Sequence, residues 1–246
     1  MTVTYEVREG IAYIAFDRRE KHNALRDEDI EALIGALRKL DGDEAANIAI
    51  LSGNGRSFSS GGDLQDRLQK SVEEGSTKGR ATEQDSFLMA ATWKPIIAAV
   101  HGYCLGHALA TALLCDHLVA TRSAKFQVTE TKIGLAMPAL LPRLGHPAFA
   151  NDVAMTGRMF TAEEAWAGGM LARLAEDDDH VSVAEELARQ ILENPQTTVR
   201  EYVRVRRTLI RQDMSRYREI TGDFDWANNA ETKIALASRL RGVGSS

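Results

Sequence analysis

The chain has 246 residues, of which 44% are hydrophobic and 26% are charged, proportions close to those of an average globular protein. This composition excludes an intrinsically disordered chain, a collagen and a coiled coil. The formal net charge of −5 argues against a nucleic-acid binder, and no segment approaches the roughly 20 apolar residues that a membrane-spanning helix needs.

The first half of the chain alternates between strand and helix patterns. Residues 10–16 are rich in β-branched and aromatic side chains and predict a strand, and so do the short apolar runs at 47–51 and 95–100. A helix is predicted over residues 27–40, where acidic residues occupy the first turn and the apolar residues fall on one stripe: Ile30, Leu33, Ile34, Leu37 and Leu40. Residues 65–86 are polar and contain several Gly, Ser and Thr, so we expect a mobile segment there.

The second half begins with a predicted helix at 107–115 and a strand at 117–121. From residue 161 onward the pattern predicts helices only, including an arginine-rich stretch at 200–218. Strands that alternate with helices favour an α/β fold built from crossover units. We therefore expect an α/β core over residues 1–195 and a C-terminal helical extension over residues 196–246.

The two cysteines, Cys104 and Cys115, are too few for a tetrahedral zinc site or for a disulfide framework, and their apolar surroundings are typical of small buried hydrophobes. His101, His117 and His146 occur singly without metal-ligand spacing, so no metal is expected. The N-terminal residues show neither the basic start nor the apolar core of a secretion signal, which makes a cytoplasmic location the expectation.

Two glycine-containing loops, residues 59–64 (SSGGDL) and 102–107 (GYCLGH), each follow a predicted buried strand and lead into a predicted helix. A helix N-terminus presents backbone N–H groups and the positive end of the helix dipole. Two such ends that converge would offer two donors to one oxygen, forming an oxyanion hole that stabilises an enolate or a tetrahedral intermediate. Ordinary strand-to-helix turns have the same pattern, so the spacing alone leaves both interpretations open.

Motifs across residues 5–175 resemble the crotonase superfamily, also called the enoyl-CoA hydratase/isomerase family. They occur in the family's order: KHNAL at 21–25, ILSGNGRSFSSGGDL at 50–64, KPIIAAVHGYCLG at 94–106, CDHLVA at 115–120, AKFQVTETKIGLAMP at 124–138 and MTGRMFTAEEAWAGGML at 155–171. The resemblance implies a crotonase-like α/β fold with a spiral ββα core and a C-terminal helical trimerisation region. It also implies an enzyme of acyl-CoA metabolism that assembles as a homotrimer or hexamer.

The resemblance places an oxyanion hole at the backbone N–H groups of Gly62 and His107, which would polarise the thioester carbonyl of an acyl-CoA. The family usually has glycine where His107 stands, but any residue except proline supplies the N–H group. The segment 62–65 matches the part of the family that lies along coenzyme A. The residues assigned to substrate and coenzyme A binding are Gly62, Asp63, Leu64, Gln65, Lys21 and Ala24. Coenzyme A is part of the substrate, so no separate cofactor is expected.

The acid/base positions narrow the reaction. Hydratases of the family use two glutamates to hold and activate water, and the positions that match them are Ala110 and Glu130. Isomerases of the family, which move a double bond from C3 to C2, use a single glutamate at the position of Glu130. Isomerisation with Glu130 as the proton shuttle is therefore favoured. Hydration is the alternative, and a degenerate member that binds CoA esters with little turnover is a third possibility.

Asp63 and Asp116 each stand at a helix boundary, where aspartate commonly caps, so both are interpreted as structural. The arginine-rich stretch at 200–218 is typical of a solvated helix face. It could alternatively face the phosphates of coenzyme A across a subunit interface. Neither nucleic acid nor a membrane is expected as a partner.

Overall fold

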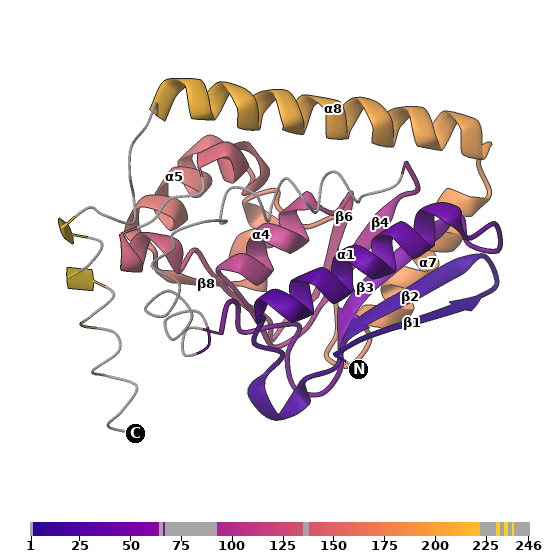
Figure 1. Cartoon of the computed structure of the whole chain (residues 1–246), viewed down its shortest axis with the longest axis horizontal. Helices are drawn as coiled ribbons and strands as arrows, with labels where there is room; N and C mark the ends of the chain where they lie inside the picture. Colours follow the sequence, from indigo (N-terminus) through magenta and orange to yellow (C-terminus); the bar gives the residue numbers. More distant parts are fainter. Residues whose placement is uncertain are drawn as a thin grey trace.

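A computed structural model of the chain describes residues 2–63, 66, 93–134 and 138–221, together with a few positions beyond residue 229. These residues form a main sheet of six strands in the order β1-β2-β3-β4-β6-β9 (Figure 1). The first two strands pair antiparallel, and every other neighbouring pair in this sheet is parallel. The strands are β1 (Val3–Arg8), β2 (Ile11–Phe16), β3 (Ile48–Gly53), β4 (Ile96–Val100), β6 (His117–Thr121) and β9 (Arg173–Ala175).

A second, smaller sheet has the order β5-β7-β8 and consists of β5 (Tyr103–Leu105), β7 (Lys125–Gln127) and β8 (Met159–Thr161). Strand β5 follows β4 almost directly, and it pairs with β7 in parallel. Strand β8 closes the sheet by pairing with β7 antiparallel. This small sheet carries the segment that leads into the helix after β5.

The helices of the described residues are α1 (Asp27–Gly42), α4 (His107–Leu114), α5 (Pro147–Thr156), α6 (Ala162–Ala167), α7 (His180–Leu192) and α8 (Gln196–Thr221). Three short 3-10 helices accompany them: η1 (Arg19–Lys21), η2 (Glu130–Ile133) and η3 (Pro138–Arg143). Helices α1, α4 and α5 contribute to a core cluster on one face of the main sheet, while α7 contributes to a separate cluster on the other.

Both faces of the central strands are buried, because successive side chains of a strand point to opposite faces. In β3, Ala49 and Leu51 belong to the cluster that includes α1 and α4, whereas Ile48 and Ile50 belong to the cluster that includes α7. The continuous apolar runs of β3 and β4 are thus explained by a parallel sheet covered on both sides. The strands predicted at 10–16, 47–51, 95–100 and 117–121 are confirmed.

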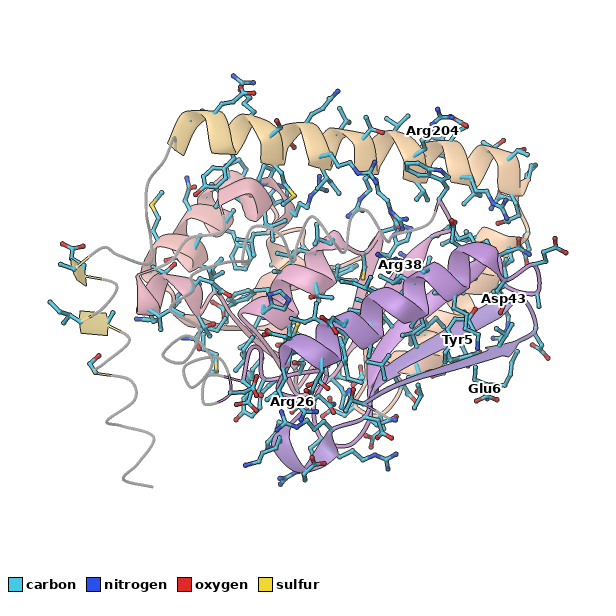
Figure 2. All side chains as sticks on the ribbon, viewed as in Figure 1. Tyr5, Glu6, Arg26, Arg38, Asp43 and Arg204 are labelled. Atoms are coloured by element: carbon cyan, nitrogen blue, oxygen red, sulfur yellow. The ribbon has the colours of Figure 1, made fainter. Side chains whose placement is uncertain are left out.

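Helix α1 confirms the prediction for residues 27–40 and extends it by one half-turn. Its stripe residues Ile30, Leu33, Leu37 and Leu40 are buried, and the side chain of Asp29 accepts a hydrogen bond from the Arg26 backbone N–H over 2.9 Å. At the far end, the hydroxyl of Tyr5 in β1 donates to the carboxylate of Asp43 over 2.9 Å (Figure 2). This bond fastens α1 to the outermost strand of the sheet.

The prediction of helices only after residue 161 is wrong, because β9 forms there and completes the edge of the main sheet beside β6. Strands β1, β7 and β8 were not predicted either, and β5 lies inside what was expected to be a plain turn. Strand β1 has six residues with apolar side chains at every second position and pairs with the adjacent β2, so the sequence did carry a signal for it. The other missed strands have three residues each, too few positions to show a period of two. Their pairing comes from partners far along the chain, as for Val119 with Arg173. The helix expected at 107–115 is confirmed by α4.

Helix α8 begins at Gln196, where the sequence predicts a helical extension, runs along one edge of the molecule (Figure 1) and packs against η3. The interpretation of its arginines as a solvated face is wrong for two of them. Arg207 is fully buried and donates to the Asp116 carboxylate over 2.7 Å, and Arg206 reaches the same carboxylate over 3.1 Å. Asp116 also accepts from the backbone N–H of Ile96 over 2.8 Å. Its predicted structural role is confirmed, but as an anchor for α8. The division of the chain at residue 195 stays a prediction.

Replacing Asp116 by alanine should lower the free energy of unfolding by about 3 kcal/mol, because the Arg207 guanidinium would remain buried without its carboxylate partner. Urea unfolding followed by circular dichroism measures this change. Asp213→Asn removes an exposed carboxylate from the same helix and should change stability by less than about 0.5 kcal/mol. Equal losses in the two variants would contradict the anchoring role of Asp116.

Candidate active site

The two glycine-containing loops run side by side at the edge where β3 and β4 end. Ser59 pairs with Cys104 as a parallel bridge, in which the Ser59 N–H donates to the Tyr103 carbonyl over 2.9 Å and the Leu105 N–H donates to the Ser59 carbonyl over 3.2 Å. Gly61 has a φ of +90°, and a Cβ there would lie 2.5 Å from the Leu105 carbonyl oxygen and 3.7 Å from the His107 nitrogen. The chain can pass this close only because residue 61 is glycine.

The backbone donors expected at Gly62 and His107 are both oriented by their surroundings. His107 is the first residue of α4, where helix geometry provides no intrahelical acceptor for the N–H group and the dipole is positive. On the other loop, the Gly61 carbonyl accepts from the Leu25 N–H and the Asp63 N–H donates to the Leu25 carbonyl, each over 2.8 Å. Because alternate backbone groups of an extended segment point to opposite sides, the Gly62 N–H points away from Leu25.

Glu130 is the first residue of η2, and its half-buried carboxylate packs against the backbone of Gly106. A Cβ on Gly106 would lie 3.1 and 3.4 Å from the two carboxylate oxygens and 2.1 Å from the Thr129 hydroxyl oxygen. The Gly106 N–H donates to the Gln127 carbonyl over 2.9 Å, which ties the end of β7 to the start of α4. The tertiary structure thus brings Glu130 directly beside the residue that precedes His107.

Ala110 lies one turn into α4, and its N–H donates to the Gly106 carbonyl over 2.9 Å. It is fully buried in the main core cluster. Helix α4 has the sequence HALATALL, which contains no carboxylate, and its only hydroxyl, on Thr111, donates back to the His107 carbonyl over 3.0 Å. Glu130 therefore faces a helix that offers backbone donors but no second acid.

The imidazole of His107, at the start of this helix, is half-buried.

Lys21 and Ala24 lie in the segment between β2 and α1, where Lys21 is exposed at the end of η1 and Ala24 is half-buried. The segment is fixed by Asn23, whose buried side-chain amide donates to the carbonyls of Asn54 and Ser57 over 2.9 and 2.8 Å. Asn23 has a φ of +53°, a conformation that asparagine adopts more readily than most residues. Sequence reasoning assigned no role to Asn23, although its place in the KHNAL motif was a usable signal.

Asp63 is engaged on both carboxylate oxygens. One accepts from the Arg18 guanidinium over 2.7 Å, and the other accepts from the Asp66 backbone N–H over 3.3 Å in the pattern of a helix N-cap. The predicted structural role of Asp63 is confirmed. Arg18 also donates to the Ala24 carbonyl over 3.0 Å, so it links the two segments assigned to coenzyme A. Leu64 and Gln65 lie outside the described residues, and so does the segment 65–86 apart from Asp66.

Cys104 and Cys115 are free, fully buried thiols, as the sequence predicts. Burial raises the pKa of the Cys115 thiol to about 12 and the pKa of Cys104 well above its usual value. Neither thiol can serve as a nucleophile, because only the thiolate reacts. Within the described ranges, no group of three or more His, Cys, Asp or Glu side chains is arranged to hold a metal ion.

His101 stands at the end of β4, directly before the loop 102–107. Its ring stacks on that of His180 with the ring centroids 4.3 Å apart, and its Nε2 lies 2.9 Å from the Gly55 carbonyl oxygen. Burial lowers the pKa of His180 to about 4, and the neighbouring His101 adds to the shift. His180 is therefore neutral at pH 7, and the stacked pair joins the root of the loop to the start of α7.

Comparison with known proteins places this geometry in a family. The family model described as enoyl-CoA hydratase/isomerase matches residues 6–229. The chain belongs to the enoyl-CoA hydratase/isomerase family. It is similar to an (E)-benzylidenesuccinyl-CoA hydratase of Thauera aromatica, with 34% identity over 78% of this chain and 76% of the relative. It is also similar to a 1,2-epoxyphenylacetyl-CoA isomerase of Escherichia coli K12, with 31% identity over 77% of this chain and 75% of the relative.

Solved structures agree with this assignment. An enoyl-CoA hydratase/isomerase from Xanthobacter autotrophicus Py2 superposes with a TM-score of 0.85 at 28% identity, covering 98% of this chain and 93% of that one. Another from Pseudoalteromonas atlantica T6c superposes with a TM-score of 0.83 at 28% identity, covering 98% of each chain. The predicted crotonase-like α/β fold and the prediction of an enoyl-CoA hydratase/isomerase-type enzyme are confirmed.

Among the described helices, none combines the length and apolar character that crossing a membrane requires.

Gly106→Ala should abolish most activity on acyl-CoA substrates, because the new methyl group would displace the Thr129 hydroxyl and the Glu130 carboxylate, and because its φ of +52° strains any other residue. Steady-state kinetics and thermal unfolding measure the two effects. Gly35→Ala is the matched control, since a Cβ at this position in α1 meets no atom within 4 Å and should leave activity unchanged. Full activity in Gly106→Ala would show that Glu130 does not depend on this contact.

Proposed function

We propose that this enzyme isomerises enoyl-CoA thioesters, moving a double bond from C3 to C2 through a dienolate. The observation that carries the proposal is the placement of one carboxylate, that of Glu130, against Gly106 beside the N-terminus of α4. The position where a hydratase of the family would carry its other glutamate is Ala110, a core residue that cannot hold water or a proton.

In the proposed reaction, the N–H groups of Gly62 and His107 donate to the thioester oxygen. Glu130 takes a proton from C2, and the electron pair of the broken C–H bond delocalises over the thioester carbonyl and the C3–C4 double bond. The same carboxyl group then gives its proton to C4, which leaves the double bond between C2 and C3 and restores the carboxylate. General base catalysis contributes on the order of 10²–10⁴-fold, and each oxyanion donor about 10²–10³-fold. The proton that leaves C2 returns to C4 of the same molecule, so substrate and product have the same composition and no separate cofactor takes part.

The proposed coenzyme A contacts are Lys21, Ala24, Gly62 and Asp63, together with Leu64 and Gln65 outside the described residues. Support comes from the charge around η1. The exposed side chain of Arg56 lies 3.3 Å from the His22 ring, and the Gly55 backbone lies against Arg19. Arg19 is paired with the Asp17 carboxylate, so the exposed Lys21 and Arg56 are the cations that suit the phosphates of coenzyme A.

Hydration is the second candidate, since the Thauera aromatica relative and an Arabidopsis thaliana relative with 33% identity are both named as hydratases. A single carboxylate counts against it, because syn addition of water in the family normally draws on both acids. A chain that binds CoA esters without turnover is the third candidate.

For the assembly we propose a homotrimer or hexamer. Helix α8 supports it by exposing Tyr202, Val205 and Leu209 on one side. A cytoplasmic location is proposed on the two free thiols, which suit a reducing compartment.

Glu130→Gln should lower kcat for isomerisation of a 3-enoyl-CoA by at least about 10²-fold, because the amide cannot accept the C2 proton. A panel of 3-enoyl-, 2-enoyl- and 3-hydroxyacyl-CoA esters measures isomerisation and hydration in parallel, with calorimetry for binding. The control Glu186→Gln makes the same charge change at an exposed position of α7 and should leave the rates unaltered.

Full activity in Glu130→Gln would overturn the assignment of the base. A wild-type protein that hydrates 2-enoyl-CoA faster than it isomerises 3-enoyl-CoA would favour the second candidate. Binding of the esters without either reaction would favour the third.

His107→Pro removes one oxyanion donor while leaving a residue that the first position of a helix tolerates. We expect kcat to fall by about 10²-fold or more with an unchanged circular dichroism spectrum. His107→Ala keeps the N–H group and should retain most of the activity. If His107→Ala lost as much as His107→Pro, the imidazole and not the backbone would be the contributing group.

A further inference from the structure

Thr129 lies where the Glu130 carboxylate meets the residue that precedes α4. Its hydroxyl is 3.4 Å from Oε2 of Glu130 and occupies the space that a Cβ on Gly106 would fill, at 2.1 Å from that position. Threonine at the N-cap of a helix ordinarily accepts a hydrogen bond from a backbone N–H. Here Thr129 is the N-cap of η2, and its side chain makes no capping hydrogen bond. The hydroxyl is directed to the carboxylate instead.

We propose that Thr129 is a positioning residue for Glu130, on the basis that Glu130 is the proton shuttle of the proposed function. The hydroxyl donates to Oε2 and holds the carboxylate group against the Gly106 backbone. This keeps the carboxylate at a constant distance from the proposed oxyanion donors. Thr129 does not itself exchange a proton with the substrate. Its backbone conformation, with φ −72° and ψ −22°, is that of the residue that begins η2. The helix therefore fixes the backbone position from which the hydroxyl approaches the carboxylate.

The separation of 3.4 Å is long for a hydroxyl-to-carboxylate hydrogen bond, for which 2.5–2.7 Å is typical. Catalytic hydrogen bonds are often long without substrate and shorten when the substrate closes the site. The space available supports such tightening, because Gly106 has no side chain and both partners already contact its backbone. A larger residue at position 106 would remove the room in which the pair is held.

The hydroxyl of the neighbouring Thr131 points to a different partner. Thr131 lies in the same 3-10 helix, and its hydroxyl donates to the Ala154 carbonyl of α5 over 2.6 Å, away from Glu130. Thr131 thus serves the packing of η2, and it provides a matched control: the same chemical deletion, in the same helix, without a contact to the carboxylate.

The test compares Thr129→Val, Thr129→Ser and Thr131→Val in the full chain. Two readouts are used: steady-state isomerisation of a 3-enoyl-CoA, and exchange of the C2 protons of butanoyl-CoA with deuterium oxide, which reports proton removal alone. Thr129→Val should lower kcat and the exchange rate on the order of tenfold, the usual weight of a hydrogen bond to a charged group. KM should change by less than about twofold, since Thr129 is not assigned to substrate binding.

Thr129→Ser restores the hydroxyl and should recover most of the lost kcat, whereas Thr131→Val should lower thermal stability with kcat and exchange unchanged. Exchange in the wild-type protein with an unaltered rate in Thr129→Val would overturn the positioning role alone. A serine variant as slow as the valine variant would also overturn it. No exchange and no isomerisation in the wild-type protein would overturn the proposed function, and this inference with it.

Discussion

The contact between the Gly106 backbone and the Glu130 carboxylate is the constraint on which the site depends. Gly106 lies between β5 and α4, and its N–H donates a hydrogen bond to the carbonyl of Gln127 at the end of β7. The same small sheet therefore sets the start of α4 and the approach to η2. Any shift of β5 against β7 would move the proposed donor at His107 and the proposed base at Glu130 together, so their spacing is preserved by backbone hydrogen bonds.

A set of short polar contacts fixes the other side of the site. The buried hydroxyl of Ser59 donates to the Asn23 carbonyl over 2.7 Å and accepts from the Gly61 N–H over 3.1 Å. Asn23 in turn holds the ends of the loop that follows β3. Buried polar networks of this kind stay rigid only when their members are satisfied. The proposed donor at Gly62 is thus held by two segments, one on each side of it.

The anchoring of α8 shows how a charged residue can be structural in a core. Arg207 lies in the interior because Asp116 and the Lys94 carbonyl accept from it over 2.7 and 3.1 Å. Arg206 meanwhile donates to the carbonyls of Leu113 and Leu114, which end α4. Cations near the C-terminal end of a helix interact favourably with its dipole. The helix that begins at the proposed site is in this way fastened at its other end by α8.

The sequence by itself determined the α/β class, the glycine loops and the presence of a glutamate at position 130 and an alanine at position 110. These features are local, since strand runs, helical stripes and glycine positions can be read within a few residues. Only the tertiary structure decided that Glu130 and Thr129 lie against Gly106, that β9 completes the sheet and that Arg207 is buried. Each of these depends on contacts between segments far apart in the chain, where pairing and packing outweigh local preference and leave no periodic pattern to detect.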